Sequence, residues 1–124
     1  MSKAIMIRNV RTIEPEDTVA LARLKMLRHG VGALPVINKD NILVGILTMR
    51  DIEFAGPGIM NLSVNSLMTR ENLVTISETT TLTEVADIMI NTGLQRLPVV
   101  DQDRHLIGLV TQSVVIVSFR ATYK

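Results

Sequence analysis

Residues 45–51 read Gly45-Ile46-Leu47-Thr48-Met49-Arg50-Asp51, and the expected fold follows from this stretch outward. The apolar run before Thr48 predicts a strand, and an aspartate three residues after a threonine is typical of the start of a helix. The junction therefore offers a hydroxyl, backbone N–H groups and a carboxylate. One interpretation is a capping box, in which the Thr48 and Asp51 side chains satisfy each other's backbone N–H. The other is a ligand site, and the two roles do not exclude each other.

The surroundings of this stretch occur twice in the chain. Shifted by 63 positions, residues 12–52 align with residues 75–115 without a gap and are identical at 12 of 41 positions. Similarity at a fixed spacing indicates two copies of one structural unit. Identical pairs that bear on the site and on the turns are Gly30/Gly93, Pro35/Pro98, Asp40/Asp103, Gly45/Gly108 and Thr48/Thr111.

Each copy is expected to hold the elements β-α-β-β-α. The first copy should have strands at 10–13, 34–37 and 43–48, a helix from about 18 to 30 and a helix from 49 to about 55. The second should have strands at 73–76, 97–100 and 106–111, a helix from about 81 to 93 and a helix from 112 to about 120. Residues 114–117 favour a strand by propensity, but the repeat favours a helix, and we follow the repeat.

Local signals support these elements. Thr81 and Glu84 predict a full capping box, whereas the first copy has Leu21 at the acid position. Residues 38–41 and 101–104 have the Asx-rich composition of hairpin turns, and residues 56–65 are expected to be a linker. Apolar residues at helical spacing are expected in the core: Val19, Ala22, Met26 and Leu27 in one helix, and Leu82, Val85, Ala86, Met89 and Ile90 in the other.

A mixed α/β (α+β) fold is therefore predicted, with two β-α-β-β-α units at residues 1–64 and 65–124. A unit of about sixty residues has a marginal core, so we expect the two to pack sheet to sheet about a pseudo-twofold axis. Such packing would create two clefts, each lined by one Gly-x-x-Thr junction.

Composition excludes several functional classes. Thirteen basic against twelve acidic residues leave a formal charge of +1 in 124 residues, and there are only three aromatic residues, so nucleic acid is not an expected partner. There is no cysteine and no run long enough to span a membrane. The N-terminus lacks the apolar region of a signal peptide, so a cytoplasmic protein is expected. No catalytic arrangement is found, and His29 and His105 lack metal-ligand spacing, so no metal site is expected.

The ordered set Gly30, Leu34-Pro35-Val36 and Gly45 to Asp51, repeated from Gly93 to Thr111, closely resembles a tandem pair of CBS (cystathionine β-synthase) domains, a Bateman module. The resemblance covers nearly the whole chain. It implies the fold described above and a non-enzymatic regulatory module. It also implies binding of an adenosine compound between the units: AMP, ADP, ATP, S-adenosylmethionine or sometimes NADH.

The resemblance also assigns roles to residues. Asp51 would accept hydrogen bonds from the ribose hydroxyls, because an ionised carboxylate offers two acceptor oxygens. Thr48, Arg50 and the backbone N–H groups of Met49 and Arg50 would receive phosphate oxygens. Val114 replaces the aspartate in the second copy, so one ribose-anchored site per chain is expected. Further contacts are expected from Ile13, Ala33 and Pro35 around the adenine, and from Arg96, Thr111 and Ser113 of the second copy. For Arg96 an exposed side chain paired with an acid is an equal alternative, and for Arg50 the alternative is a solvated side chain.

The expected function is a stand-alone regulatory module that binds AMP, ADP or ATP and signals to an effector protein. The alternative is a scaffold for dimerisation whose nucleotide site has decayed, which Val114 favours and Asp51 opposes. The apolar helix at 114–119 either covers its own unit or forms an interface. Modules of this kind commonly dimerise through such helices, so a homodimer is expected.

Overall fold

The computed structural model describes residues 5–122, with side chains to residue 119. Residues 1–4 and 123–124, on which part of the signal-peptide analysis and the aromatic Tyr123 fall, lie outside the described residues. The chain forms two compact units. One is Arg11–Leu73, and the other joins the N-terminal segment up to Val10 to the chain from Val74 onward. The sequence-based division at residues 64 and 65 stays a prediction about the repeats.

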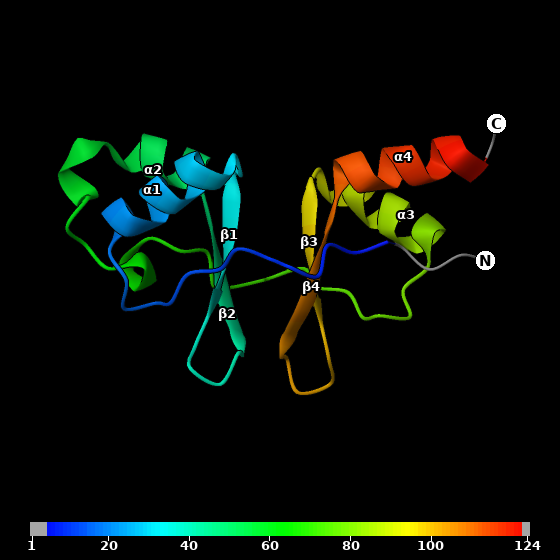
Figure 1. Ribbon diagram of the computed structural model, residues 1–124, viewed down its shortest axis with the longest axis horizontal. Helices are drawn as coiled ribbons and strands as arrows, with labels where there is room; N and C mark the ends of the chain where they lie inside the picture. Colours follow the sequence, from blue (N-terminus) through cyan, green and yellow to red (C-terminus); the bar gives the residue numbers. More distant parts are fainter. Residues whose placement is uncertain (1–4, 123–124) are drawn as a thin grey trace. The chain divides into compact units, whose positions relative to one another are not determined.

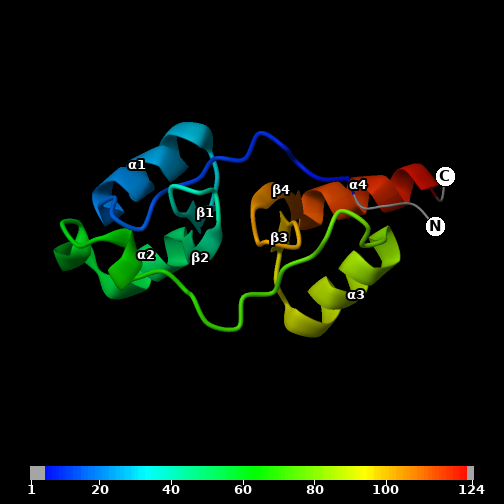
Figure 2. The same cartoon turned by 90° about the horizontal axis from the view of Figure 1, so that it is seen from below.

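The unit Arg11–Leu73 consists of one hairpin and two α-helices. Its elements are α1 (Val19–His29), β1 (Ala33–Ile37), β2 (Leu43–Thr48), α2 (Met49–Ala55) and the 3-10 turns η1 (Pro57–Ile59) and η2 (Val64–Ser66). The strands β1 and β2 are antiparallel, and both helices lie on the same side of the hairpin (Figures 1 and 2). Buried residues between them include Val19, Ala22, Met26, Leu34, Leu47 and Ile52.

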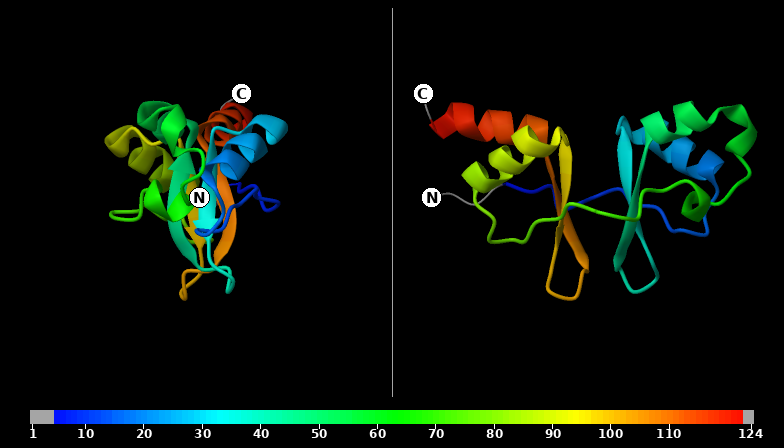
Figure 3. Two further views of the ribbon diagram at one scale, coloured as in Figure 1. Left: turned by 90° about the vertical axis from the view of Figure 1, so that its left-hand side faces the viewer. Right: turned by 180° about the vertical axis from the view of Figure 1, so that it is seen from behind.

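The second unit repeats this arrangement. Its elements are α3 (Leu82–Thr92), β3 (Arg96–Val100), β4 (Leu106–Thr111) and α4 (Gln112–Thr122). The hairpin turn of each unit lies at the end of the hairpin away from the helices (Figure 3). The α4 helix confirms the prediction made from the repeat against strand propensity. Thr111 caps it by accepting a hydrogen bond from the Val114 N–H (3.3 Å), and Val115 is buried with Phe119 packed beside it.

The expected first strands of the two copies are wrong in extent. Within residues 10–13 and 73–76, only Ile13 and Ile76 form bridges, each parallel to a hairpin strand. The Ile13 N–H donates to the Pro35 carbonyl (3.2 Å), and the Ile37 N–H donates to the Ile13 carbonyl (3.0 Å). Extending this ladder toward the N-terminus would require an N–H from Pro35, which proline lacks. The shared prolines Pro35 and Pro98 therefore limit each first strand to a single bridge.

Glycine is needed where a further segment crosses each hairpin. Thr69 pairs with Ile46, and the N–H and carbonyl groups of the two residues exchange hydrogen bonds of 2.9 Å. A Cβ on Gly45 would lie 2.6 Å from the Met68 sulfur and 2.9 Å from the Thr69 carbonyl oxygen. At the equivalent Gly108, a Cβ would meet Met6 and the backbone of Ile7, the residue that pairs with Leu109. The repeated glycine therefore permits close approach of a third backbone segment in each unit.

The structure also tests the predicted helix ends, the predicted linker and two predicted core positions. Gly30 and Gly93 end α1 and α3 in the left-handed conformation, as expected of C-cap glycines. The expected linker at residues 56–65 packs on the first compact unit, because Val64 is fully buried and its N–H donates to the Asp17 carbonyl (2.7 Å). Residues 56–65 thus belong to the first compact unit. Leu27 and Ile90, expected in the core, are 57% and 78% exposed.

Candidate functional site: the Thr48–Asp51 junction

The junction between β2 and α2 forms a complete capping box. The Thr48 hydroxyl accepts a hydrogen bond from the Asp51 N–H (3.1 Å), and Asp51 Oδ2 accepts one from the Thr48 N–H (3.0 Å). Both side chains are half-buried. The capping interpretation is therefore confirmed. The capping box leaves part of the carboxylate available. Among the described residues, the hydrogen bond to the Asp51 side chain involves only Oδ2, one of its two oxygens.

The hairpin register brings the expected apolar residues to this junction. Ala33 lies directly opposite Thr48, and Pro35 lies opposite Ile46. Ile13 joins them through its bridge beside Pro35. Ala33, Pro35 and Ile13 are buried residues of the same compact unit. The unit Arg11–Leu73 thus assembles an acid and a hydroxyl at the end of an apolar strand pair.

One expected phosphate contact is wrong. The Met49 N–H donates to the Gly32 carbonyl (2.9 Å) and is therefore not free to bind a ligand. The Asp51 N–H is taken by the cap. Arg50 remains as a residue with an exposed side chain one position before Asp51. At this helix start, a phosphate could therefore be bound by the charged Arg50 guanidinium but not by a series of free backbone N–H groups.

The matching junction of the second unit lacks the acid. Thr111 caps α4 through its hydroxyl alone, and Val114 occupies the position of Asp51. Arg96 lies opposite Thr111 in the β3–β4 register, as Ala33 lies opposite Thr48. Ser113 is exposed. Arg96, Thr111 and Ser113 therefore share one junction of their own, which has a cation and hydroxyl groups but no carboxylate.

A second acid-containing cap, away from this junction, provides a reference. At the start of α3 the Thr81 hydroxyl accepts from the Glu84 N–H (3.2 Å), and Glu84 Oε1 accepts from the Thr81 N–H (3.1 Å). Hydrogen bonds from the Thr81 hydroxyl and N–H lower the pKa of the exposed Glu84 carboxyl. A capping box thus also occurs in this protein at a helix start that does not directly follow a hairpin strand.

Comparison with known proteins identifies the family. The CBS-domain family model matches residues 3–56 and 64–118. The chain belongs to the CBS-domain family. It is a tandem CBS pair, and the repeat found in the sequence corresponds to its two CBS domains. The resemblance drawn from the motif residues is confirmed.

Two solved structures of CBS pairs resemble this chain along its whole length. CBSX2 of Arabidopsis thaliana, crystallised in complex with AMP, is 25% identical with a TM-score of 0.88, and the match covers 100% of both chains. The CBS domain pair of protein MJ0100, in complex with 5′-methylthioadenosine and S-adenosyl-L-methionine, is 26% identical with a TM-score of 0.87. That match covers 98% of each chain. The mixed α/β fold class predicted from the sequence is confirmed.

A curated relative is an enzyme, but the CBS pair matches little of it. Inosine-5′-monophosphate dehydrogenase from Thermoplasma acidophilum is 39% identical over 114 residues, which are 92% of this chain and 22% of the enzyme. The chain thus spans about a fifth of this relative's length. The match shows no catalytic domain. In the described residues no helix is long and apolar enough to cross a membrane.

Proposed function

We propose that this CBS pair is a regulatory module that binds an adenosine nucleotide through Thr48 and Asp51. The observation that carries the proposal is the half-buried Asp51 carboxylate, which has one oxygen engaged in the helix cap and lies beside an apolar strand pair. A carboxylate accepts two hydroxyl donors in the way a ribose diol requires. The AMP and S-adenosyl-L-methionine complexes of the two similar CBS pairs support the same class of ligand.

The proposed contacts divide by chemistry. Asp51 accepts hydrogen bonds from the ribose, Thr48 and Arg50 contact phosphate, and Ile13 with Ala33 and Pro35 lines the adenine. The second CBS domain supplies Arg96, Thr111 and Ser113 for phosphate or solvent-mediated contacts. Because Val114 cannot accept a hydrogen bond, we propose one ribose-anchored nucleotide per chain.

Signalling requires that the nucleotide favours one arrangement of the two CBS domains over another. A ligand shifts such an equilibrium only by its difference in affinity for the two states. We propose that an effector protein reads this shift in the cytoplasm, where adenine nucleotides are available. AMP, ADP and ATP are the leading ligands, with S-adenosylmethionine next.

A homodimer is the second part of the proposal. On α4, Ile116 is 51% exposed and Val117 is 65% exposed, so the apolar helix is only partly covered within its own unit. On α1, Leu24 is also exposed. Apolar side chains left exposed to water on one helix, such as Ile116 and Val117 on α4, favour an interface. Light scattering coupled to gel filtration should give twice the chain mass, and the Val117→Glu variant should give the monomer mass if α4 forms the interface.

A scaffold module with a decayed site is the competing function. The completed Thr48–Asp51 capping box favours it, because the two side chains already have a structural use. Thermal unfolding with AMP, ADP, ATP, S-adenosylmethionine and NADH separates the two functions. A ligand at a hundred times its dissociation constant adds about 2.7 kcal/mol to the free energy of unfolding, which raises the melting temperature by several degrees. No shift with any of the five ligands would favour the scaffold.

A further inference from the structure

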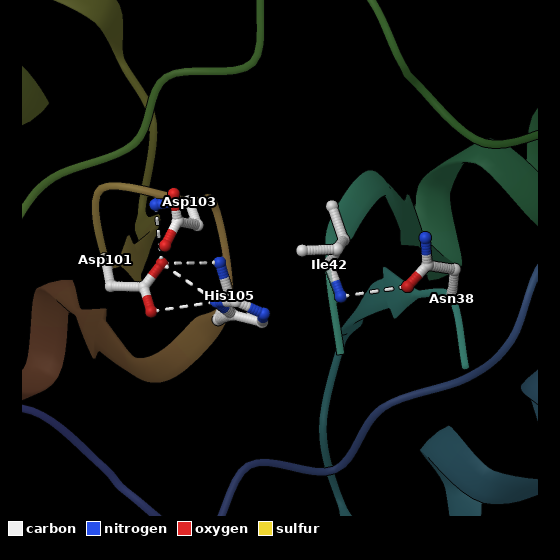
Figure 4. Close-up of polar contacts among 5 residues, drawn as sticks. All are labelled: Asn38, Ile42, Asp101, Asp103 and His105. Atoms are coloured by element: carbon white, nitrogen blue, oxygen red, sulfur yellow. Dashed lines mark hydrogen bonds and ion pairs between the residues drawn. The ribbon is translucent and has the colours of Figure 1, made fainter. Parts of the chain in front are cut away.

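The turn between β3 and β4 carries three side chains able to bind a metal ion. Asp101, Asp103 and His105 occupy alternate positions of the turn, and their ligand atoms all lie within 4.8 Å of one another (Figure 4). His105 is half-buried, and the two aspartates are exposed. No other group of three histidine or acidic side chains in the described part of the chain comes together in this way.

The turn does not need these side chains for its own geometry, as its counterpart in the other unit shows. There, Asn38 Oδ1 accepts hydrogen bonds from the N–H groups of Asp40 (2.9 Å) and Ile42 (3.0 Å). In the same way, Asp101 Oδ1 accepts from the N–H groups of Asp103 (2.9 Å) and His105 (2.8 Å). One side-chain oxygen at the first position is therefore enough. The second carboxylate oxygen of Asp101 and the imidazole of His105 are not required to form the turn.

The additional groups are already oriented toward one another. His105 Nδ1 lies 2.9 Å from Asp101 Oδ2, the oxygen that the backbone of the turn leaves unused. Around a tetrahedral zinc ion, donor atoms lie about 3.3 Å apart, given metal–ligand distances near 2.0–2.2 Å. Small rotations of the Asp101, Asp103 and His105 side chains would bring their ligand atoms to that spacing. The Asp101–His105 pair would keep its orientation.

The ligand set selects a class of metal. An imidazole with two carboxylates suits Zn²⁺ and similar transition-metal ions, whereas Mg²⁺ and Ca²⁺ prefer oxygen ligands alone. Two carboxylates outnumber Arg104, the one cation of the turn. We propose that Asp101, Asp103 and His105 form a solvent-accessible site for a divalent transition-metal ion, with one coordination position left to water. The site is separate from the Thr48–Asp51 junction, and the proposal does not depend on nucleotide binding.

The experiment uses the full chain without a polyhistidine tag, freed of metal by a chelator and kept free of nucleotide. The sequence contains two histidines, so the imidazole region of a ¹H–¹³C spectrum has two sets of signals, which His29→Gln and His105→Ile assign. Titration with Zn²⁺ should shift or broaden the His105 signals while those of His29, on α1, stay in place. Calorimetry should give one Zn²⁺ per chain.

The variants test each ligand with little risk to the fold. Asp101→Asn and His105→Ile place on this turn the residues that Asn38 and Ile42 supply in the equivalent one, and Asp103→Asn leaves the backbone N–H in place. Loss of a ligand should weaken Zn²⁺ binding roughly tenfold or more, whereas His29→Gln should leave binding unchanged. Equal Zn²⁺ affinity in Asp101→Asn and the wild type would overturn the proposal. So would an equal response of His29 and His105, or no His105 response at millimolar Zn²⁺; either result would reduce the group to an ordinary turn with an ion pair.

Discussion

Replacement of Asp51 by asparagine should separate its two roles, helix capping and ribose binding. The amide oxygen of the introduced asparagine can still accept the Thr48 N–H that Asp51 Oδ2 accepts at 3.0 Å, so the cap survives. What is lost is the negative charge in the first turn of α2, worth about 0.3–1 kcal/mol of stability. We therefore expect Asp51→Asn to unfold at a slightly lower urea concentration than the wild type.

The effect on nucleotide affinity should be larger. Hydrogen bonds to a charged group contribute about 1.5–3 kcal/mol each, and an amide oxygen that already accepts the Thr48 N–H has one lone pair left for the two hydroxyls of a ribose. Removal of one such bond should raise the dissociation constant for AMP roughly 10- to 150-fold. Calorimetry on the wild type and Asp51→Asn measures this change.

Glu84→Gln is the matched control. Glu84 makes the same capping box at α3, with its carboxylate 3.1 Å from the Thr81 N–H. Both variants should lose a similar, small amount of stability, and only Asp51→Asn should lose affinity. If the two variants bound AMP equally well, Asp51 would be a cap and nothing more.

Three further predictions concern the repeat. Gly45→Ala should cost about 1–3 kcal/mol of unfolding free energy by urea titration, because the new methyl group would lie 2.9 Å from the Thr69 backbone carbonyl oxygen, which cannot move aside as the Met68 side chain can; a neutral result would contradict the close approach. The lowered pKa of Glu84 means that its ionised form stabilises the folded state. The stability advantage of the wild type over Glu84→Gln should be present at pH 7 and fade as the pH falls below the ordinary carboxyl value, and unfolding curves showing no such trend would argue against the cap. Val114→Asp should complete a capping box with Thr111 and raise the number of AMP molecules per chain measured by calorimetry; unchanged stoichiometry would show that the acid alone does not make a site.

Much of the fold follows from the repeat. Residues 112–122 show this best, because their valines and isoleucine favour a strand, yet the alignment with α2 predicts the observed helix. The hairpins and the C-cap glycines are local signals that need no tertiary information. The shortness of the first strand of each copy could not be predicted in this way. It depends on the missing N–H of the proline in the hairpin strand, and the effect of that proline is known only once the pairing of Ile13 with Val36 is known.

Positions at the surface were harder to predict. Leu27 and Ile90 fit the helical period of the core, but the hairpin covers too narrow a face of α1 and α3 to bury them. The segment 56–65 has the glycines and proline of a linker, and the burial of Val64 within it depends on contacts with residues far earlier in the chain, such as Asp17.

The site shows a similar division. Asp51 follows Thr48 by three residues, so the contact between their side chains and backbone can be predicted from the sequence, whereas the hydrogen bond from the Met49 N–H to the Gly32 carbonyl cannot. The group at Asp101, Asp103 and His105 escapes a search for paired histidines. Its signal is an Asp-x-Asp-x-His pattern within a hairpin turn, where alternate residues converge because Asp101 binds the backbone of the turn.

The central claim is that the acid in the first CBS domain, and its absence from the second, determines where an adenosine compound binds. A crystal structure of the chain grown with AMP tests this claim most directly. We predict one nucleotide per chain, with a ribose hydroxyl within hydrogen-bonding distance of the Asp51 carboxylate. A nucleotide whose ribose lay beside Val114, with Asp51 making only its cap to Thr48, would contradict the account.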